Sequence, residues 1–84
     1  MSMYYVIARI KVPYLPKNWK NVVREAMREI TNDVCRLPPQ EFEVSDGLVF
    51  RQYVGNACLD DVVKQLDEIA RRLGGYAEIT VTEA

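Results

Sequence analysis

The 84-residue sequence contains no histidine and only two serines, Ser2 and Ser45. Histidine is the side chain that most often acts as a general base near neutral pH, and it is also the commonest metal ligand. Without it, neither a serine nor a cysteine has its usual activating partner, so a catalytic triad in its ordinary form is excluded. We therefore expect a protein that is not an enzyme and that has no catalytic residues, no cofactor and no metal.

Long hydrophobic runs are also missing. The longest apolar run is a handful of residues, far below the roughly 20 that are needed to cross a bilayer. The amino terminus shows no charged segment followed by an apolar one, which a secretory leader would need. We expect a soluble, cytoplasmic protein with no membrane partner.

Cysteine is scarce, with only Cys35 and Cys58 in the chain. Two cysteines are too few for a disulfide-built miniprotein, and they form neither a CxxC motif nor a zinc-like spacing. We expect two free thiols in a fold that depends on its core. A disulfide is the alternative if the chain comes from an oxidising compartment or a hyperthermophile, and if the first helix ends before Cys35.

The composition that remains is typical of a folded globular protein, with 49% hydrophobic and 27% charged residues. A chain of this length has one core, so we expect a single domain over residues 1–84. The net charge of -1 hides an uneven distribution. Residues 1–36 carry seven basic and three acidic side chains, and residues 37–84 carry four basic and nine acidic ones.

Two kinds of hydrophobic spacing alternate along the chain. Residues 4–12 alternate apolar and polar positions, which predicts a strand with one buried face. Residues 19–37 place apolar side chains three and four apart, which predicts a helix that Pro38 and Pro39 terminate. Residues 41–44 and 48–54 alternate again and predict two strands joined by a turn.

The second half of the chain repeats the helix and strand patterns. Apolar positions from residue 59 to residue 73 predict a second helix, with Asn56 as its cap and Asp60 and Asp61 near its start. Gly74 and Gly75 predict the end of this helix, and residues 76–82 alternate as a last strand.

The resulting order, β-α-β-β-α-β, is that of the split βαβ or ferredoxin-like arrangement. This α+β fold has a four-stranded antiparallel sheet with both helices on one face and the first and third strands in the centre. Many unrelated activities use this order, so function has to be argued from particular residues.

The turn between the two middle strands decides which side chains the open sheet face presents. A three-residue loop over residues 45–47 puts Phe42 opposite Phe50 and Val44 opposite Leu48, whereas a two-residue turn would set glutamates beside the apolar positions. We favour the three-residue loop, because each buried aromatic or aliphatic side chain contributes about 1.5–3 kcal/mol. In this register Arg51 lies opposite Glu41.

This register gives the open face both apolar and charged side chains. Glu41 and Glu43 can be a pair for acid-base chemistry or a hard metal, but we favour solubilising charges that pair with Arg51. The apolar side chains of the two central strands can form a contiguous patch on this face. An exposed apolar patch usually binds a partner, so we expect homodimerisation or binding of another protein. The residues of the expected interface are Tyr5, Ile7, Val49, Arg51 and Tyr53.

A row of basic side chains, here called the basic row, lies opposite the apolar stripe of the first helix. It indicates either a solvated face or a surface for phosphates or an acidic partner, so nucleic-acid binding is the alternative function. Its members are Lys17, Lys20, Arg24 and Arg28.

One segment resembles the RNP1 pattern of RNA-recognition-motif domains, which share this order of elements. Residues 46–53 keep the glycine of that pattern, one stacking aromatic at Phe50 and the last aromatic at Tyr53. They depart from it at Asp46, Leu48 and Arg51. The preferred register also buries Phe50, which favours protein association over RNA binding.

Overall fold

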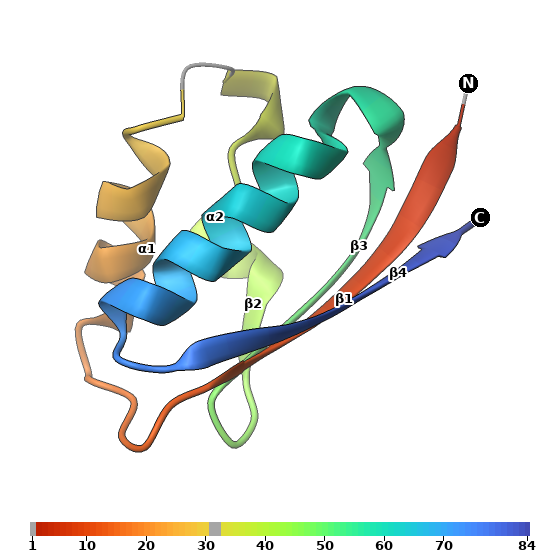
Figure 1. The fold of residues 1–84 in the computed structure, drawn as a ribbon. Coiled ribbons are helices and arrows are strands. Elements are labelled where there is room, and N and C mark those ends of the chain that lie inside the picture. The colour runs from red at the N-terminus through yellow and green to blue at the C-terminus, as the bar shows by residue number, and fades with distance from the viewer. Residues whose placement is uncertain (1, 31–32) are drawn as a thin grey trace.

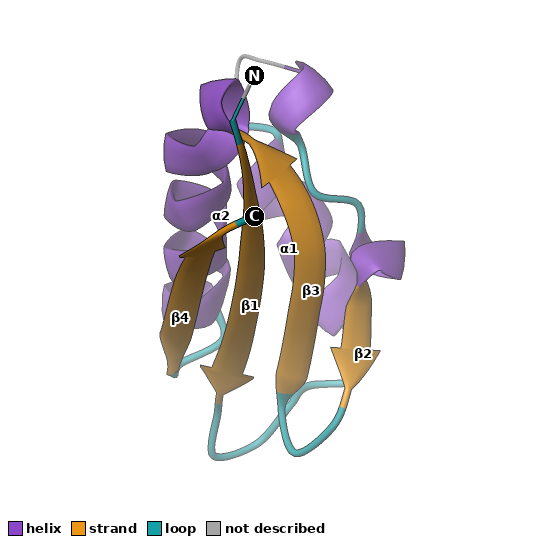
Figure 2. Cartoon of the chain, turned by 90° about the vertical axis from the view of Figure 1, so that its right-hand side faces the viewer, coloured by secondary structure: helices purple, strands orange, loops and turns teal. Residues whose placement is uncertain are grey.

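The computed structural model describes residues 2–30 and 33–84, and its elements follow the predicted β-α-β-β-α-β order (Figure 1). The strands form one antiparallel sheet in the order β2-β3-β1-β4, and both helices cover the same face (Figure 2). The predicted ferredoxin-like arrangement is therefore confirmed. The elements are β1 (Met3–Lys11), α1 (Trp19–Met27), β2 (Phe42–Val44), β3 (Leu48–Gly55), α2 (Leu59–Arg72) and β4 (Tyr76–Glu83).

The central strand β1 has the predicted alternation. Val6, Ala8 and Ile10 are buried against the helices, whereas Tyr5 and Ile7 lie on the opposite, open face. None of the helices described, over residues 2–30 and 33–84, is long and apolar enough to cross a membrane.

The hairpin between β2 and β3 has the register that a three-residue loop requires. Phe42 pairs with Phe50, and Val44 pairs with Leu48. The two phenylalanine rings lie 5.5 Å apart between centroids and both are buried. Gly47 has a φ of 107°, and a Cβ at this position would lie 2.2 Å from the Ile10 carbonyl oxygen. The turn therefore requires glycine for both its conformation and its close approach to β1.

The first helix is shorter than the prediction of residues 19–37. It ends at Met27, and after a turn at Ile30 the chain forms a 3-10 turn over Asp33–Cys35. Residues 31–32 of the predicted helix lie outside the described part of the chain. Thr, Asn and Asp, which follow Ile30, are weak helix formers, so the local sequence favours an early end.

The second helix has the predicted acidic start and glycine stop, but it lacks the predicted cap. Asp60 and Asp61 lie in its first turn, and Gly74 follows its end with a φ of 81°. Asn56 instead begins a 3-10 turn over Asn56–Cys58, and the N-cap position of α2 is Cys58, without a side-chain cap hydrogen bond. The prediction of Asn56 as the cap is therefore wrong.

An ion-pair network joins the end of α2 to the segment after α1. Arg72 donates hydrogen bonds to Glu29 and to Glu68, and Arg71 also donates to Glu68. The hydrogen bonds from Arg71 and Arg72 hold the pKa of the Glu68 carboxyl below its usual value. The network lies at the surface, with Glu68 and Arg72 half-buried and Arg71 and Glu29 exposed, so it orients the two segments more than it stabilises them.

The early end of α1 also reverses the expectation of two free thiols. Cys35 is buried in the 3-10 turn and forms a disulfide with Cys58, with a Cα to Cα distance of 5.3 Å. A helix continuing through residue 37 would have pointed Cys35 away from the apolar side. Because the helix stops, Cys35 meets the start of α2, and the bond closes a loop with a sequence separation of 23.

This disulfide is expected to stabilise the fold by restricting the unfolded chain. Replacing both cysteines, Cys35→Ala with Cys58→Ala, should lower the free energy of unfolding by about 2–4 kcal/mol, the usual effect for a loop of this length. Urea denaturation of the wild type with and without dithiothreitol, beside the double variant, measures this effect. If dithiothreitol leaves the free energy of unfolding of the wild type unchanged, the prediction is wrong.

Candidate association surface

Two tyrosines, one from each central strand, lie side by side on the open face, near one end of the strands. Tyr5 of β1 pairs directly with Tyr53 of β3, and their ring centroids are 4.8 Å apart. The rings are tilted by 46°, which is a favourable arrangement for neighbouring aromatics. Tyr53 is 63% exposed, so the pair is accessible to a partner.

The other predicted interface residues continue from this pair but do not form one apolar patch. Ile7 is half-buried and pairs with Arg51 on β3. Val49 lies beyond Arg51, between Arg9 and Glu43, and is only 3% exposed. The accessible apolar side chains of the open face are therefore Met3, Tyr5, Ile7 and Tyr53 at one end of the sheet and Tyr76 at the other.

The far half of the open face is charged, with both signs present. Arg51 Nη1 lies 3.9 Å from Glu43 Oε2, and Lys11 Nζ lies 4.0 Å from Glu78 Oε1. Arg9 pairs with Glu78 across β1 and β4. Exposed pairs of this kind contribute little to stability, but they determine which charges a partner meets.

The expected pairing of Arg51 with Glu41 is wrong. Strand β2 begins only at Phe42, and Glu41 lies in a 3-10 turn over Pro39–Glu41, where its Oε2 accepts a hydrogen bond from Gln52. Glu41 and Glu43 thus have different partners and do not form a paired-carboxylate site. Among the described residues, no group of three or more Cys, Asp or Glu side chains is arranged to hold a metal ion.

The RNP1-like segment does not present the aromatic that the resemblance implies. Phe50 is fully buried against Phe42 in the core, as the preferred register predicted. Of the aromatics in this segment, only Tyr53 reaches the open face.

The basic row is exposed along α1 and its flanks, as predicted. Lys20 Nζ lies 5.7 Å from the Trp19 ring, Arg24 donates to Asn21, and Arg28 forms an ion pair with Glu25.

Arg36 joins this basic surface, an addition that the sequence did not predict. Together with Arg24, Arg28, Met27 and Pro38 it lines a hollow of about 340 Å³. The predicted longer helix would have placed Arg36 about two turns beyond Arg28, so its arrival here depends on the chain reversal after Ile30.

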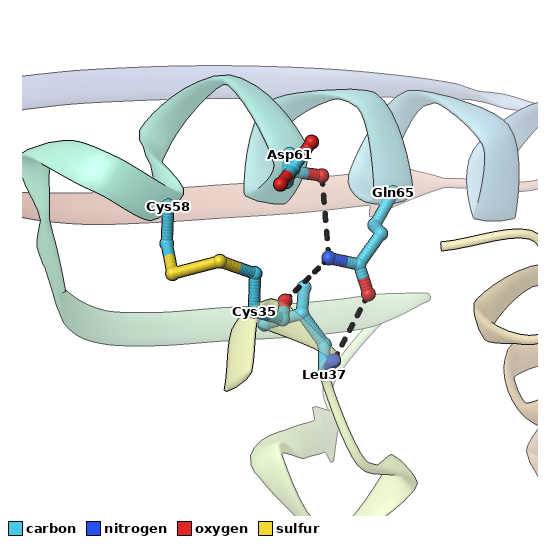
Figure 3. Close-up of a disulfide and its surroundings, with 5 residues drawn as sticks. All are labelled: Cys35, Leu37, Cys58, Asp61 and Gln65. Atoms are coloured by element: carbon cyan, nitrogen blue, oxygen red, sulfur yellow. Dashed lines mark hydrogen bonds between the residues drawn. A yellow bond between two sulfur atoms is a disulfide. The ribbon is translucent and has the colours of Figure 1, made fainter. Parts of the chain in front are cut away.

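Gln65 is a structurally important residue that the sequence pattern did not single out. It is 1% exposed on the buried face of α2, where its Oε1 accepts from the Leu37 amide at 2.9 Å (Figure 3). Its Nε2 donates to the Cys35 carbonyl at 2.6 Å and to the Asp61 carbonyl at 3.2 Å. The available signal was its position between Val62 and Ile69 in an apolar stripe, where a polar residue needs buried partners.

Removing the Gln65 amide should destabilise the protein even though leucine is more apolar. Gln65→Leu leaves the Leu37 amide and the Cys35 carbonyl buried without partners, so we expect a loss of about 2–4 kcal/mol in the free energy of unfolding. The same substitution at the exposed Gln52 is the control and should cost less than about 1 kcal/mol. Denaturant unfolding under oxidising conditions compares the two variants. A Gln65→Leu variant as stable as the wild type would show that these hydrogen bonds are dispensable.

No family model, no curated protein and no solved structure matches the chain.

Proposed function

We propose that this protein is a non-catalytic association module that forms a homodimer through the open face of its sheet. The observation that carries the proposal is the contact of Tyr5 and Tyr53, with Ile7 beside them, on a sheet face that neither helix covers. Tyrosine is enriched among the residues that contribute most to binding, because its ring adds large apolar area and its hydroxyl keeps a hydrogen bond.

The charges of the open face favour a second copy as the partner. A twofold axis brings the same surface of both copies together, so each basic group can meet an acidic group of the partner. Arg9, Lys11 and Arg51 supply the basic groups, and Glu43 and Glu78 supply the acidic ones. A partner of one charge sign would leave the groups of that same sign opposed to like charges.

The size of the sheet indicates that the charged half belongs to the interface. Strands about 4.8 Å apart and eight residues of about 3.4 Å each make a flat face of roughly 500 Å². A stable interface usually buries about 800 Å² of accessible surface on each partner, and accessible surface exceeds flat area because it follows the side chains. Even the whole face only approaches that value, so the tyrosine end alone is too small, the dimer needs the charged half as well, and its affinity should fall as salt increases.

The disulfide bears on where this module works. Disulfides persist in oxidising compartments, and in the cytosol mainly in hyperthermophiles. The Cys35–Cys58 bond therefore favours one of these two environments over an ordinary reducing cytoplasm. A cytoplasmic location stays a prediction for the case of a hyperthermophile.

Charge introduced at the centre of the tyrosine pair should prevent dimerisation. We expect the wild type to have twice the 9.7 kDa chain mass at high micromolar concentration, and Tyr53→Glu to be a monomer, because dimerisation would bury the carboxylate. Tyr14→Glu is the matched control, because Tyr14 is 72% exposed and lies outside the sheet. Light scattering after size exclusion gives both masses. A monomeric wild type, or a Tyr53→Glu variant that still dimerises, would refute the proposal.

Polyanion binding through the basic row is the second candidate function. The observation that favours it is the hollow where Arg36 joins Arg24 and Arg28. Contacts of these side chains with phosphates would release counterions, so binding would weaken steeply with salt.

A pair of charge-matched variants tests this candidate. Arg24→Ala with Arg28→Ala should weaken binding of a single-stranded oligonucleotide at least tenfold at low salt, because two phosphate contacts are lost. Lys64→Ala with Arg71→Ala removes the same charge from exposed positions of α2 and should leave binding unchanged. Fluorescence anisotropy across a salt series measures both. Equal losses in the two variants would mean that only net charge matters, and no binding by the wild type would eliminate the candidate.

A further inference from the structure

The two edges of strand β3 differ in how much of their length pairs with a neighbouring strand. On one side β1 pairs with β3 along its whole length, from Leu48 to Gly55. On the other side β2 pairs only with residues 48–50, because β2 has three residues (Figure 2). Among the strands of the described residues, none pairs with the outer edge of the second half of β3.

Two hydrogen bonds identify which backbone groups face this open edge. In antiparallel sheets, alternate residues of a central strand bond to opposite neighbours. The Asn56 amide donates to Ser2 on the β1 side, which assigns the even-numbered residues to β1. The Ser45 amide donates to the Gly47 carbonyl on the β2 side, which assigns the odd-numbered residues to the other edge.

The amide and carbonyl groups of Tyr53 and Gly55 accordingly point outward from the edge. Within residues 2–30 and 33–84, neither residue has a backbone hydrogen bond on that side. An extended chain next to this edge would meet an amide and a carbonyl at every second residue, which is the pattern that a peptide strand satisfies.

An apolar pocket of about 390 Å³ lies beside this open edge. Its walls include Phe50 and Val54 from β3, Val62 from α2 and Leu37 from the segment that faces them. The far wall is held in place by the Cys35–Cys58 disulfide and by Gln65 (Figure 3). In an added strand, side chains opposite the even-numbered residues would point toward the helix side, where the pocket lies.

Two charged side chains line the pocket, and one of them has an ion-pair partner within the protein. Arg36 forms an ion pair with Asp33 at 2.9 Å and also donates to the Ile30 carbonyl. The Glu41 carboxylate accepts a hydrogen bond from the neutral Gln52 amide and keeps its charge, so an acidic ligand would be repelled. The walls formed by Leu37, Val54 and Val62 are apolar, so the side chain that fits the pocket is an uncharged, aliphatic one.

We propose that the open edge of β3 binds an extended, uncharged peptide segment as an added strand, with one aliphatic side chain in the pocket. This site is separate from the open face, because it uses outward backbone groups and the helix side of β3. It does not depend on dimerisation.

Gly55 allows the edge to be blocked without disturbing the fold. Its φ is -68° and its ψ is 152°, values that proline adopts without strain, and the residue before it lies in a strand, which proline favours. Gly55→Pro removes the outward amide and places a ring at the edge. Gly55→Ala is the matched control, because a Cβ at Gly55 would only touch Met3 Sδ at 3.9 Å.

A random heptapeptide library displayed on phage, selected against the full-length oxidised wild type, supplies the probe. We expect enriched peptides to bind the wild type and Gly55→Ala alike, and Gly55→Pro at least tenfold more weakly. Circular dichroism and thermal unfolding should show that Gly55→Pro is folded. A library without enriched sequences, or enriched peptides that bind Gly55→Pro as well as Gly55→Ala, would overturn the proposal.

Hydrogen exchange of the wild type provides a second measurement that does not need a variant. The Tyr53 amide should exchange rapidly in the free protein and become protected when an enriched peptide binds, whereas the Gln52 and Val54 amides should be protected in both states. Protection of Tyr53 without peptide that increases with protein concentration would assign the edge to a second copy and overturn the proposal.

Discussion

The side-chain amide of Gln65 determines the course of the chain between α1 and β2, and the surfaces of the molecule depend on that course. It satisfies the Leu37 amide and the Cys35 carbonyl from inside α2, and the disulfide joins the same segment to Cys58. Segment 35–37 is thereby held against α2, and Arg36 within it lies next to α1 instead of at the end of a longer helix. The 3-10 turn that follows limits β2 to three residues, because Pro39 has no amide to donate and the Glu41 amide donates to the Pro38 carbonyl.

The strands were predictable because each has an apolar face that must be buried. Alternation in β1 placed Val6, Ala8 and Ile10 in the core, and matching Phe42 with Phe50 was enough to determine the hairpin register. The length of α1 was not predictable in the same way. Ile30 continues the apolar stripe, but a stripe records only which positions suit a helix. It does not include the tertiary hydrogen bonds that the reversed chain gains from α2.

The predictions about the candidate sites were right where they depended on strand alternation and incomplete where they depended on contacts between distant residues. Sequence alternation predicted correctly that Tyr5 and Tyr53 share the open face, because side-chain direction in a strand follows residue number. Exposure was predicted less well, since it depends on neighbours across the sheet. Val49 has the expected direction but is covered. The disulfide and the Gln65 contacts join residues far apart in the sequence, and only the folded chain brings them together.

Strand β3 takes part in both proposed surfaces without conflict, because its side chains and backbone groups point in perpendicular directions. The Tyr53 ring lies on the open face beside Tyr5, whereas its amide and carbonyl lie in the plane of the sheet at the outer edge. A second copy stacked on the open face approaches along the sheet normal, and an added peptide strand approaches within the sheet plane. Burial of the Tyr53 side chain therefore leaves the edge accessible, and a proline at Gly55 blocks the edge without altering the tyrosine pair.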